Sequence, residues 1–108
     1  MTKIYVVNRG GHNHEDAKRF GEIIFLSEGL MNRYAVTQIY RQFATILRDS
    51  EPEDYILVTG LTIMNSIACS IFSRLHGRLN LLLYKSSSDG GRYVERVLRI
   101  DDLLGKEK

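Results

Sequence analysis

Apolar residues in this chain occur in two kinds of pattern, unbroken runs and runs with helical spacing. Short apolar runs, β-branched at 4–8 and 54–59, are typical of buried strands, which we expect at residues 4–8, 22–27, 54–59 and 79–84. Apolar residues three and four positions apart predict helices over residues 36–47 and 62–75. The charge order of the polar segment 12–20 favours a short helix, and the alternating residues 92–100 predict a strand that forms a hairpin with 79–84.

The predicted order of elements is β-α-β-α-β-α-β-β, which indicates an α/β fold. Strands that alternate with helices form a mostly parallel sheet, because the crossovers are right-handed. We therefore expect a Rossmann-like three-layer sandwich with a C-terminal antiparallel hairpin. A chain of 108 residues is about the size of one domain, so residues 1–108 should form a single α/β domain with 101–108 as a mobile tail.

The two longer helices have different apolar surfaces. The helix at 36–47, with Asn32 as its expected cap, should pack one face on the sheet. The helix at 62–75, which Gly77 should end, is apolar over a wide arc and has mainly serines as polar residues. Such a helix is either buried inside the fold or part of a subunit interface, and we expect a homodimer.

Composition excludes several classes of protein. No run approaches the roughly 18 apolar residues of a membrane span, and the apolar N-terminal run is too short for a signal peptide. A single cysteine, Cys69, cannot form an internal disulfide and indicates a reducing, cytoplasmic location. The net charge of +2 is too small to indicate a coat for nucleic acid, so no duplex nucleic acid is expected as a partner.

Ligands of parallel α/β sheets bind beyond the carboxyl ends of the strands. That rule selects the loops at residues 9–14, 27–32, 60–62 and 85–91. In the turn from Thr59 to Thr62, free amides at a helix start can receive an anion, and Gly60 allows a ligand to approach the backbone. The alternative is that Thr62 only caps the helix and Gly60 only makes the turn.

The loop after the first strand is unusual because it combines glycines, a cation and imidazoles. Its candidate ligand-binding residues are Asn8, Arg9, Gly10, Gly11 and His12. The spacing of His12 and His14 suits a metal, but no further ligand stands at a recognisable spacing, so neither a metal nor another cofactor is expected. Either imidazole could act as a general base or donate a hydrogen bond to a phosphate, or it could simply be solvated. The segment 86–91 is typical of a hairpin turn, and His76 suits a helix C-terminus.

Residues 54–84, which read DYILVTGLTIMNSIAC and continue to LNLLLY, resemble the second motif of the CRISPR-associated Rossmann-fold (CARF) sensors. Those domains place a Thr-Gly-Gly-Thr-like turn between a central strand and a helix. The resemblance implies that Thr59, Gly60 and Thr62 contact a cyclic oligonucleotide, with residues 8–11 as the second loop across a homodimer two-fold axis. Leu61 departs from the usual second glycine. A CARF-like chain of this length would be a stand-alone binder, a sponge or a ring nuclease.

Three functional hypotheses follow. The first is a small stand-alone nucleotide-binding protein whose ligand is a cyclic oligonucleotide or a related phosphate-bearing signalling molecule. The second is a non-catalytic interaction protein that uses the apolar helix at 63–75 with Tyr34, Tyr40 and Phe43. The third is a small metal-independent phosphodiesterase that uses His12 or His14. The P-loop, the Gly-X-Gly-X-X-Gly fingerprint and the Gly-X-Ser-X-Gly elbow are absent, which argues against classical nucleotide and serine-hydrolase chemistry.

Overall fold

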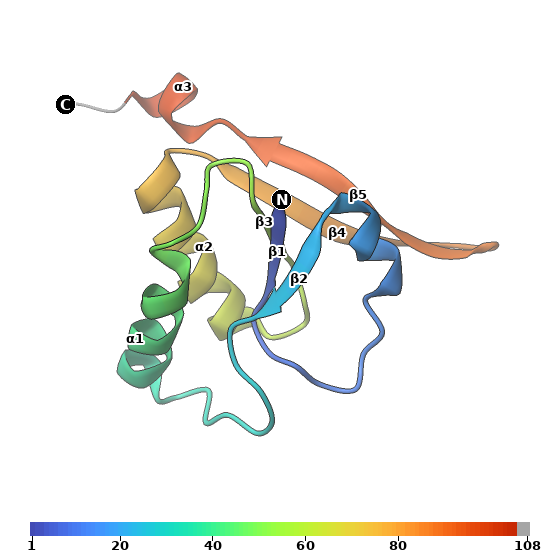
Figure 1. Cartoon of the computed structure of the whole chain (residues 1–108), viewed down its shortest axis with the longest axis horizontal. Coiled ribbons are helices and arrows are strands. Elements are labelled where there is room, and N and C mark those ends of the chain that lie inside the picture. The colour runs from blue at the N-terminus through green and yellow to red at the C-terminus, as the bar shows by residue number, and fades with distance from the viewer. Residues whose placement is uncertain (106–108) are drawn as a thin grey trace.

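A computed structural model describes residues 1–105 and contains one five-stranded sheet. Its strands are β1 (Lys3–Val6), β2 (Glu22–Phe25), β3 (Tyr55–Leu57), β4 (Leu79–Ser87) and β5 (Gly90–Leu98). They lie in the order β2-β1-β3-β4-β5, and β1 to β4 are parallel while β4 and β5 form an antiparallel hairpin (Figure 1). The α/β class, the mostly parallel sheet and the C-terminal hairpin are therefore confirmed.

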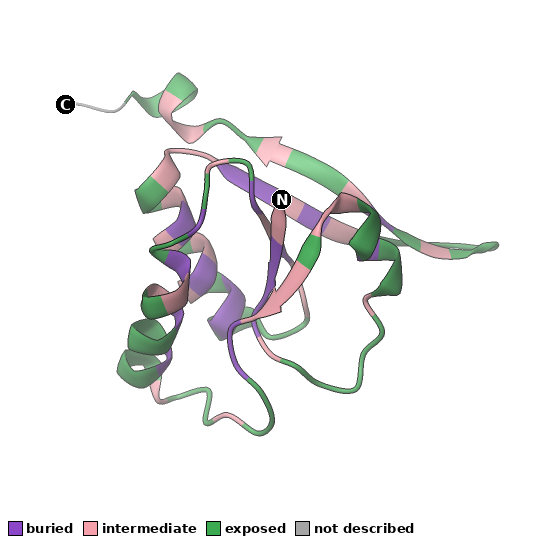
Figure 2. Cartoon of the chain, in the orientation of Figure 1, coloured by how far each residue is buried: buried purple, intermediate pink, exposed green. Residues whose placement is uncertain are grey.

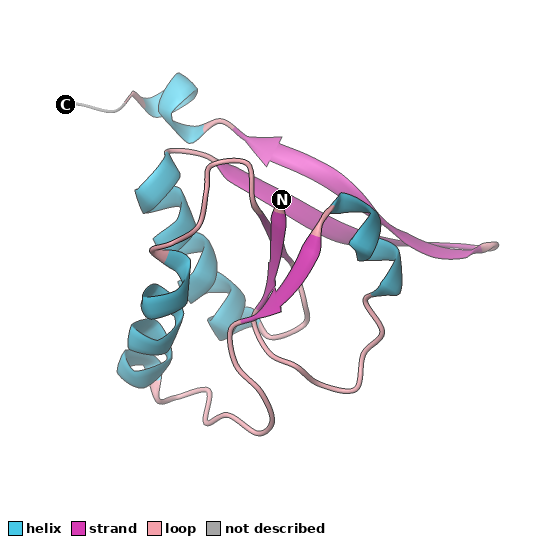
Figure 3. Ribbon diagram, viewed as in Figure 1, coloured by secondary structure: helices cyan, strands magenta, loops and turns pink. Residues whose placement is uncertain are grey.

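The two faces of the sheet are covered unequally. The helices α1 (Val36–Leu47) and α2 (Thr62–His76) pack side by side on one face, and a short 3-10 helix, η1 (Glu15–Phe20), lies on the other (Figure 3). Three full layers are therefore not confirmed, since within residues 1–105 the second face carries only η1. None of the helices in this range is both long and apolar enough to cross a bilayer.

Alternation along the strands divides the core into two clusters. Tyr5 and Ile56 point toward α1 and α2, where they meet Phe43 and Phe72, while Ile4, Val6, Leu57 and Leu82 point toward η1. Figure 2 shows the buried positions of β1 and of the inner faces of the helices. Successive strand residues serve opposite faces, which is why these strands read as unbroken apolar runs.

Several local expectations need correction. Asn32 does not cap α1, which begins after Ala35, because the Asn32 side chain accepts a hydrogen bond from the Tyr34 amide in the preceding turn. The loop expected at 85–91 is mostly strand, since Ser87 pairs with Gly90 and only Ser88 and Asp89 form the turn.

The C-terminal segment begins with a helix. A short helix, α3 (Ile100–Leu104), follows β5, and the Asp101 amide donates a 2.9 Å hydrogen bond to the Gly77 carbonyl at the end of α2. Ile100 packs against the core beneath α2. Residues 106–108 of the expected tail lie outside the described residues.

Helix α2 agrees with the expectation at its C-terminal end, and its burial is partial. Gly77 ends it in the left-handed conformation, as expected, but Ile63 and Leu75 on its outer surface are exposed. The helix is therefore not wholly buried inside the fold.

Buried Asp54 ties the amino ends of three strands together. Its carboxylate accepts hydrogen bonds from the amides of Lys3 (2.9 Å) and Glu51 (2.8 Å), and its carbonyl accepts one from the Asn80 side chain (2.7 Å). These bonds connect the start of β1, the turn before β3 and the start of β4.

Replacing this carboxylate should destabilise the whole sheet. In Asp54→Ala, two amides lose a charged acceptor, so we expect the free energy of unfolding to fall by about 2–3 kcal/mol in urea denaturation. Asp49→Ala, which removes an exposed carboxylate nearby, is the matched control and should change it by less than about 0.5 kcal/mol. Equal effects of the two substitutions would contradict the role of Asp54.

Candidate functional site

A cavity of about 990 Å³ opens at the carboxyl ends of β1, β3 and β4. This is the edge at which ligands bind in parallel α/β sheets. Its walls come from the loop after β1, the turn after β3, and the β4-β5 hairpin. The lining residues are Asn8, Gly10, Gly11, His12, Asn13, His14, Leu57, Val58, Thr59, Gly60, Leu61, Leu83, Tyr84 and Tyr93.

The cavity brings together most of the residues that the sequence selected. Asn8, Gly10, Gly11 and His12 line it together with Thr59 and Gly60. Two selected residues, Arg9 and Thr62, do not line it, and neither does the expected ligand loop at 27–32.

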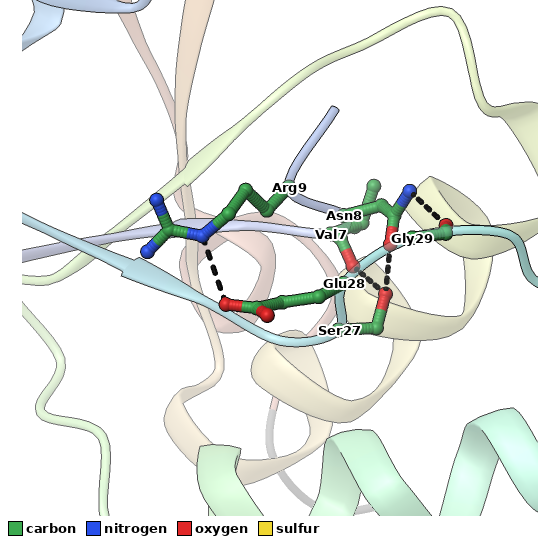
Figure 4. Close-up of polar contacts among 6 residues, drawn as sticks. All are labelled: Val7, Asn8, Arg9, Ser27, Glu28 and Gly29. Atoms are coloured by element: carbon green, nitrogen blue, oxygen red, sulfur yellow. Dashed lines mark hydrogen bonds and ion pairs between the residues drawn. The ribbon is translucent and has the colours of Figure 1, made fainter. Parts of the chain in front are cut away.

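Arg9 faces away from the cavity, toward β2. Its guanidinium lies 4.1 Å from the centre of the Phe25 ring, and its Nε donates a 2.9 Å hydrogen bond to the Glu28 carboxylate (Figure 4). With its charge paired in this way, Arg9 is part of the link between the loops that follow β1 and β2.

Asn8 holds the same two loops together. Its amide nitrogen donates a 2.9 Å hydrogen bond to the Gly29 carbonyl, and its oxygen lies 2.7 Å from the Ser27 hydroxyl (Figure 4). The Arg9 amide adds a 2.8 Å bond to the Ser27 carbonyl. Asn8 is thus a wall residue that fixes the path of the chain leading to the glycines and histidines.

The turn after β3 is shaped by Asn65, which the sequence analysis missed. The buried Asn65 side chain donates a 2.7 Å hydrogen bond to the Thr59 carbonyl, while the Thr59 hydroxyl accepts a 3.1 Å bond from the Leu61 amide. The signal available in the sequence was a polar residue one turn into a largely apolar helix. When such a side chain is buried, it needs a hydrogen-bond partner in the preceding turn. Thr59 therefore supports the turn.

Gly60 and the start of α2 remain open to a ligand. A Cβ built at Gly60 meets no atom within 4 Å. Thr62 does not cap the helix, because Leu61 is the N-cap residue of α2 and its side chain makes no cap hydrogen bond. Within residues 1–105, the amides of Thr62, Ile63 and Met64 have no protein acceptor. They leave partial positive charge beside the Gly60 edge of the cavity.

The opposite wall is built from two tyrosines of the hairpin. Tyr84 and Tyr93 are register partners, and their rings pack edge to face with centroids 5.3 Å apart. The Tyr93 hydroxyl lies 3.1 Å from His14 Nδ1, so the hairpin holds the more buried of the two histidines. Sequence reasoning missed both tyrosines. Only the register of the β4-β5 hairpin shows that their side chains lie on the same face of the sheet.

Helix η1 fixes the position of Tyr93 through its backbone. The Tyr93 amide donates a 2.7 Å hydrogen bond to the Asp16 carboxylate, and the Tyr93 carbonyl accepts one from the Arg19 guanidinium. Asp16 and Arg19 also pair with each other at 3.5 Å. We call these three residues the Tyr93 clamp.

The lining has no carboxylate, lysine or arginine, and its ionisable side chains are two histidines and two tyrosines. Burial, aided by the neighbouring His12, lowers the pKa of His14. Burial likewise raises the pKa of the Tyr93 hydroxyl, which stays protonated. Among the described residues, no group of three His, Cys, Asp or Glu side chains is close enough to hold a metal ion.

A family model, described as phage Pam3 gp32-like protein, matches residues 2–100, so the chain belongs to that family. No curated protein and no solved structure matches it significantly. The resemblance of residues 54–84 to CARF sensors is therefore wrong as an assignment, because nearly the whole chain fits a different family. What it detected is the strand-turn-helix unit that many parallel α/β sheets share.

The histidines should make stability depend on pH. Burial lowers the pKa of His14, and burial also lowers that of His76, whose Nε2 lies 2.8 Å from the Ser50 hydroxyl. An imidazole in the unfolded chain has a pKa of about 6.5. The unfolded chain therefore binds more protons than the folded chain as the pH falls through that value, and the free energy of unfolding decreases.

We expect Tm to fall between about pH 7.5 and about pH 5.5, a range that lies above most carboxylate titrations. His14→Asn and His76→Gln, which keep a polar atom near the bonded nitrogen, should each reduce that fall in thermal denaturation at a series of pH values. If both variants lost as much Tm as the parent over this range, the two histidines would not be its source.

Proposed function

We propose that this member of the phage Pam3 gp32-like family binds a phosphate-bearing, nucleotide-type ligand in the cavity formed by the loops after β1 and β3 and the hairpin. The observation that carries the proposal is the composition of this cavity: two imidazoles and two tyrosines around about 990 Å³, with no carboxylate in the lining. A cavity without acidic groups, at the end of a sheet where ligands bind, favours an anion.

The phosphate end of the ligand would lie beside Gly60. The unpaired amides at the start of α2 supply hydrogen-bond donors there, and the open space above Gly60 allows a phosphate to approach the backbone. Exposed His12, on the facing loop, adds an imidazole that can donate a hydrogen bond to the phosphate.

The base end would lie against the hairpin. Tyr84 offers an exposed aromatic surface, and Leu57 and Leu83 supply apolar walls. A base stacked on an aromatic side chain contributes about 1–3 kcal/mol to binding. The volume is near the upper end of the about 300–1,000 Å³ range of small-molecule sites, which favours a cyclic or linear oligonucleotide over a mononucleotide. The lone Cys69 supports a cytoplasmic setting for such a ligand.

A second candidate, metal-independent cleavage of the ligand, is favoured by the two histidines. The His12 and His14 rings lie 6.5 Å apart in the same cavity, and Tyr93 orients His14. One imidazole would take the proton of a ribose 2′-hydroxyl as its oxygen bonds to phosphorus. The other, protonated, would give a proton to the departing 5′-oxygen as its bond to phosphorus breaks.

Binding is tested by adding a side chain at the open glycine. We expect Gly60→Val to weaken the ligand's affinity at least about tenfold, because its branched side chain blocks the phosphate position without backbone strain. The measurement is a thermal-shift screen of mononucleotides, dinucleotides and cyclic oligonucleotides, in which a ligand at about 100 times its Kd adds about 2.7 kcal/mol of stability. Titration calorimetry of any hit then gives the Kd of each variant.

Thr45→Val is the matched control. It puts the same side chain at an exposed position of α1, outside the cavity, and should leave the Kd within about twofold of the parent. A folded Gly60→Val variant that binds as well as the parent would place the ligand elsewhere. A parent that responds to none of these nucleotides would remove the proposal.

Cleavage is tested separately on a ligand that binds. If the protein turns it over, His12→Ala and His14→Ala should each lower kcat about a hundredfold or more while Kd changes a few-fold, because proton transfer acts in the transition state. Cleavage should persist in EDTA. Product that forms at the parent rate in both variants would exclude acid-base catalysis by this pair.

A further inference from the structure

We propose that the protein forms a two-fold dimer in which α3 of each copy docks in a groove between α1 and α2 of the other. The groove, of about 600 Å³, lies on the outer side of the helix layer, away from the β1 and β3 loops. Its lining residues are Val36, Tyr40, Ala44, Arg48, Ser66, Ile67, Ser70, Ile71, Arg74 and Leu75. This inference does not depend on the ligand proposed above.

The groove is shaped to receive an apolar segment. Val36, Tyr40 and Leu75 on its walls are each about half exposed, which is unusual for three large apolar side chains in one groove. Its serines are satisfied internally, because the Ser66 hydroxyl donates to the Thr62 carbonyl and the Ser70 hydroxyl to the Ser66 carbonyl. The small serines therefore offer a close, effectively apolar floor.

One end of the groove is basic and lacks a partner. Arg48, at the C-terminal end of α1, and Arg74, in the last turn of α2, are both exposed, and neither side chain makes a hydrogen bond or ion pair within residues 1–105. The groove lining contains no carboxylate. Two copies that met groove to groove would bury unpaired arginines, so the charges favour an acidic occupant.

α3 of a second copy has the complementary chemistry. Leu103 is 87% exposed, and the adjacent Asp102 makes no ion pair within the described residues. None of the α3 residues lines the groove of its own chain. An exposed leucine beside a free carboxylate matches a groove whose exposed leucine, Leu75, lies beside Arg74.

The position of α3 suits a reciprocal exchange. The bond from the Asp101 amide to the Gly77 carbonyl holds α3 beyond the C-terminal end of α2 (Figure 1), and Arg74 of the groove lies in the last turn of that helix. Because α3 and that end of the groove are neighbours, one two-fold axis beside them can bring each α3 to the other copy's groove. Both contacts then form at once, as in an isologous interface.

A charge-reversal cycle on the full chain tests the exchange. Sedimentation velocity over a dilution series gives the dimer Kd of the parent, Arg74→Glu, Asp102→Arg and the double variant. We expect each single reversal to raise the Kd about tenfold or more, because it places like charges in contact, and the double variant to return it to within about threefold of the parent. Leu103→Asp should also weaken the dimer.

Arg41→Glu, on α1 outside the groove, and Asp89→Arg, at the hairpin turn, are matched controls that should leave the Kd unchanged. All these side chains are exposed, so thermal denaturation should give each variant the Tm of the parent under monomeric conditions. A parent that stays monomeric would overturn the proposal. So would a dimer insensitive to both single reversals, or a double variant no better than the singles, since a different occupant would then fill the groove.

Discussion

The candidate cavity depends on the Tyr93 clamp, in which two side chains of η1 bind the backbone of Tyr93. β5 is the edge strand of the sheet, and the Asp16 and Arg19 side chains take up the amide and carbonyl that Tyr93 would otherwise present to solvent. Covering an edge in this way also protects it from pairing with another chain. Since Tyr93 in turn bonds His14, one contact on the less covered face of the sheet sets the relative positions of the loop after β1 and the hairpin.

Hydrogen bonds within the loops decide which polar groups remain for a ligand. Asn8 and Thr59, which lie at the ends of adjacent strands, have their side chains engaged by Ser27, Gly29 and Leu61. The groups left free are backbone amides, imidazoles and aromatic surface. These recognise phosphate and bases by hydrogen bonding and stacking, and they need no fixed charge in the cavity.

Much of the fold was predictable because its signals are local. Apolar runs marked the parallel strands, helical spacing marked α1 and α2, and Gly77 marked a helix end that requires a left-handed residue. Of the eight residues selected at or next to the carboxyl strand ends, six line the cavity. It was less predictable that the second face of the sheet would lack a full helical layer. The polar segment before β2 is short, and its length limits that of η1.

The parts that could not be predicted depend on contacts between distant residues. Tyr84 and Tyr93 belong to the cavity only because the hairpin register pairs them, and Arg9 leaves it because Glu28, nineteen positions later, offers a carboxylate. α3 is held by the Gly77 carbonyl, a contact that no pattern within residues 100–104 indicates. In each case a short sequence was compatible with two environments, and long-range pairing chose between them. This ambiguity affects charged and aromatic side chains most. They are long and can turn either toward a ligand or toward a neighbouring strand.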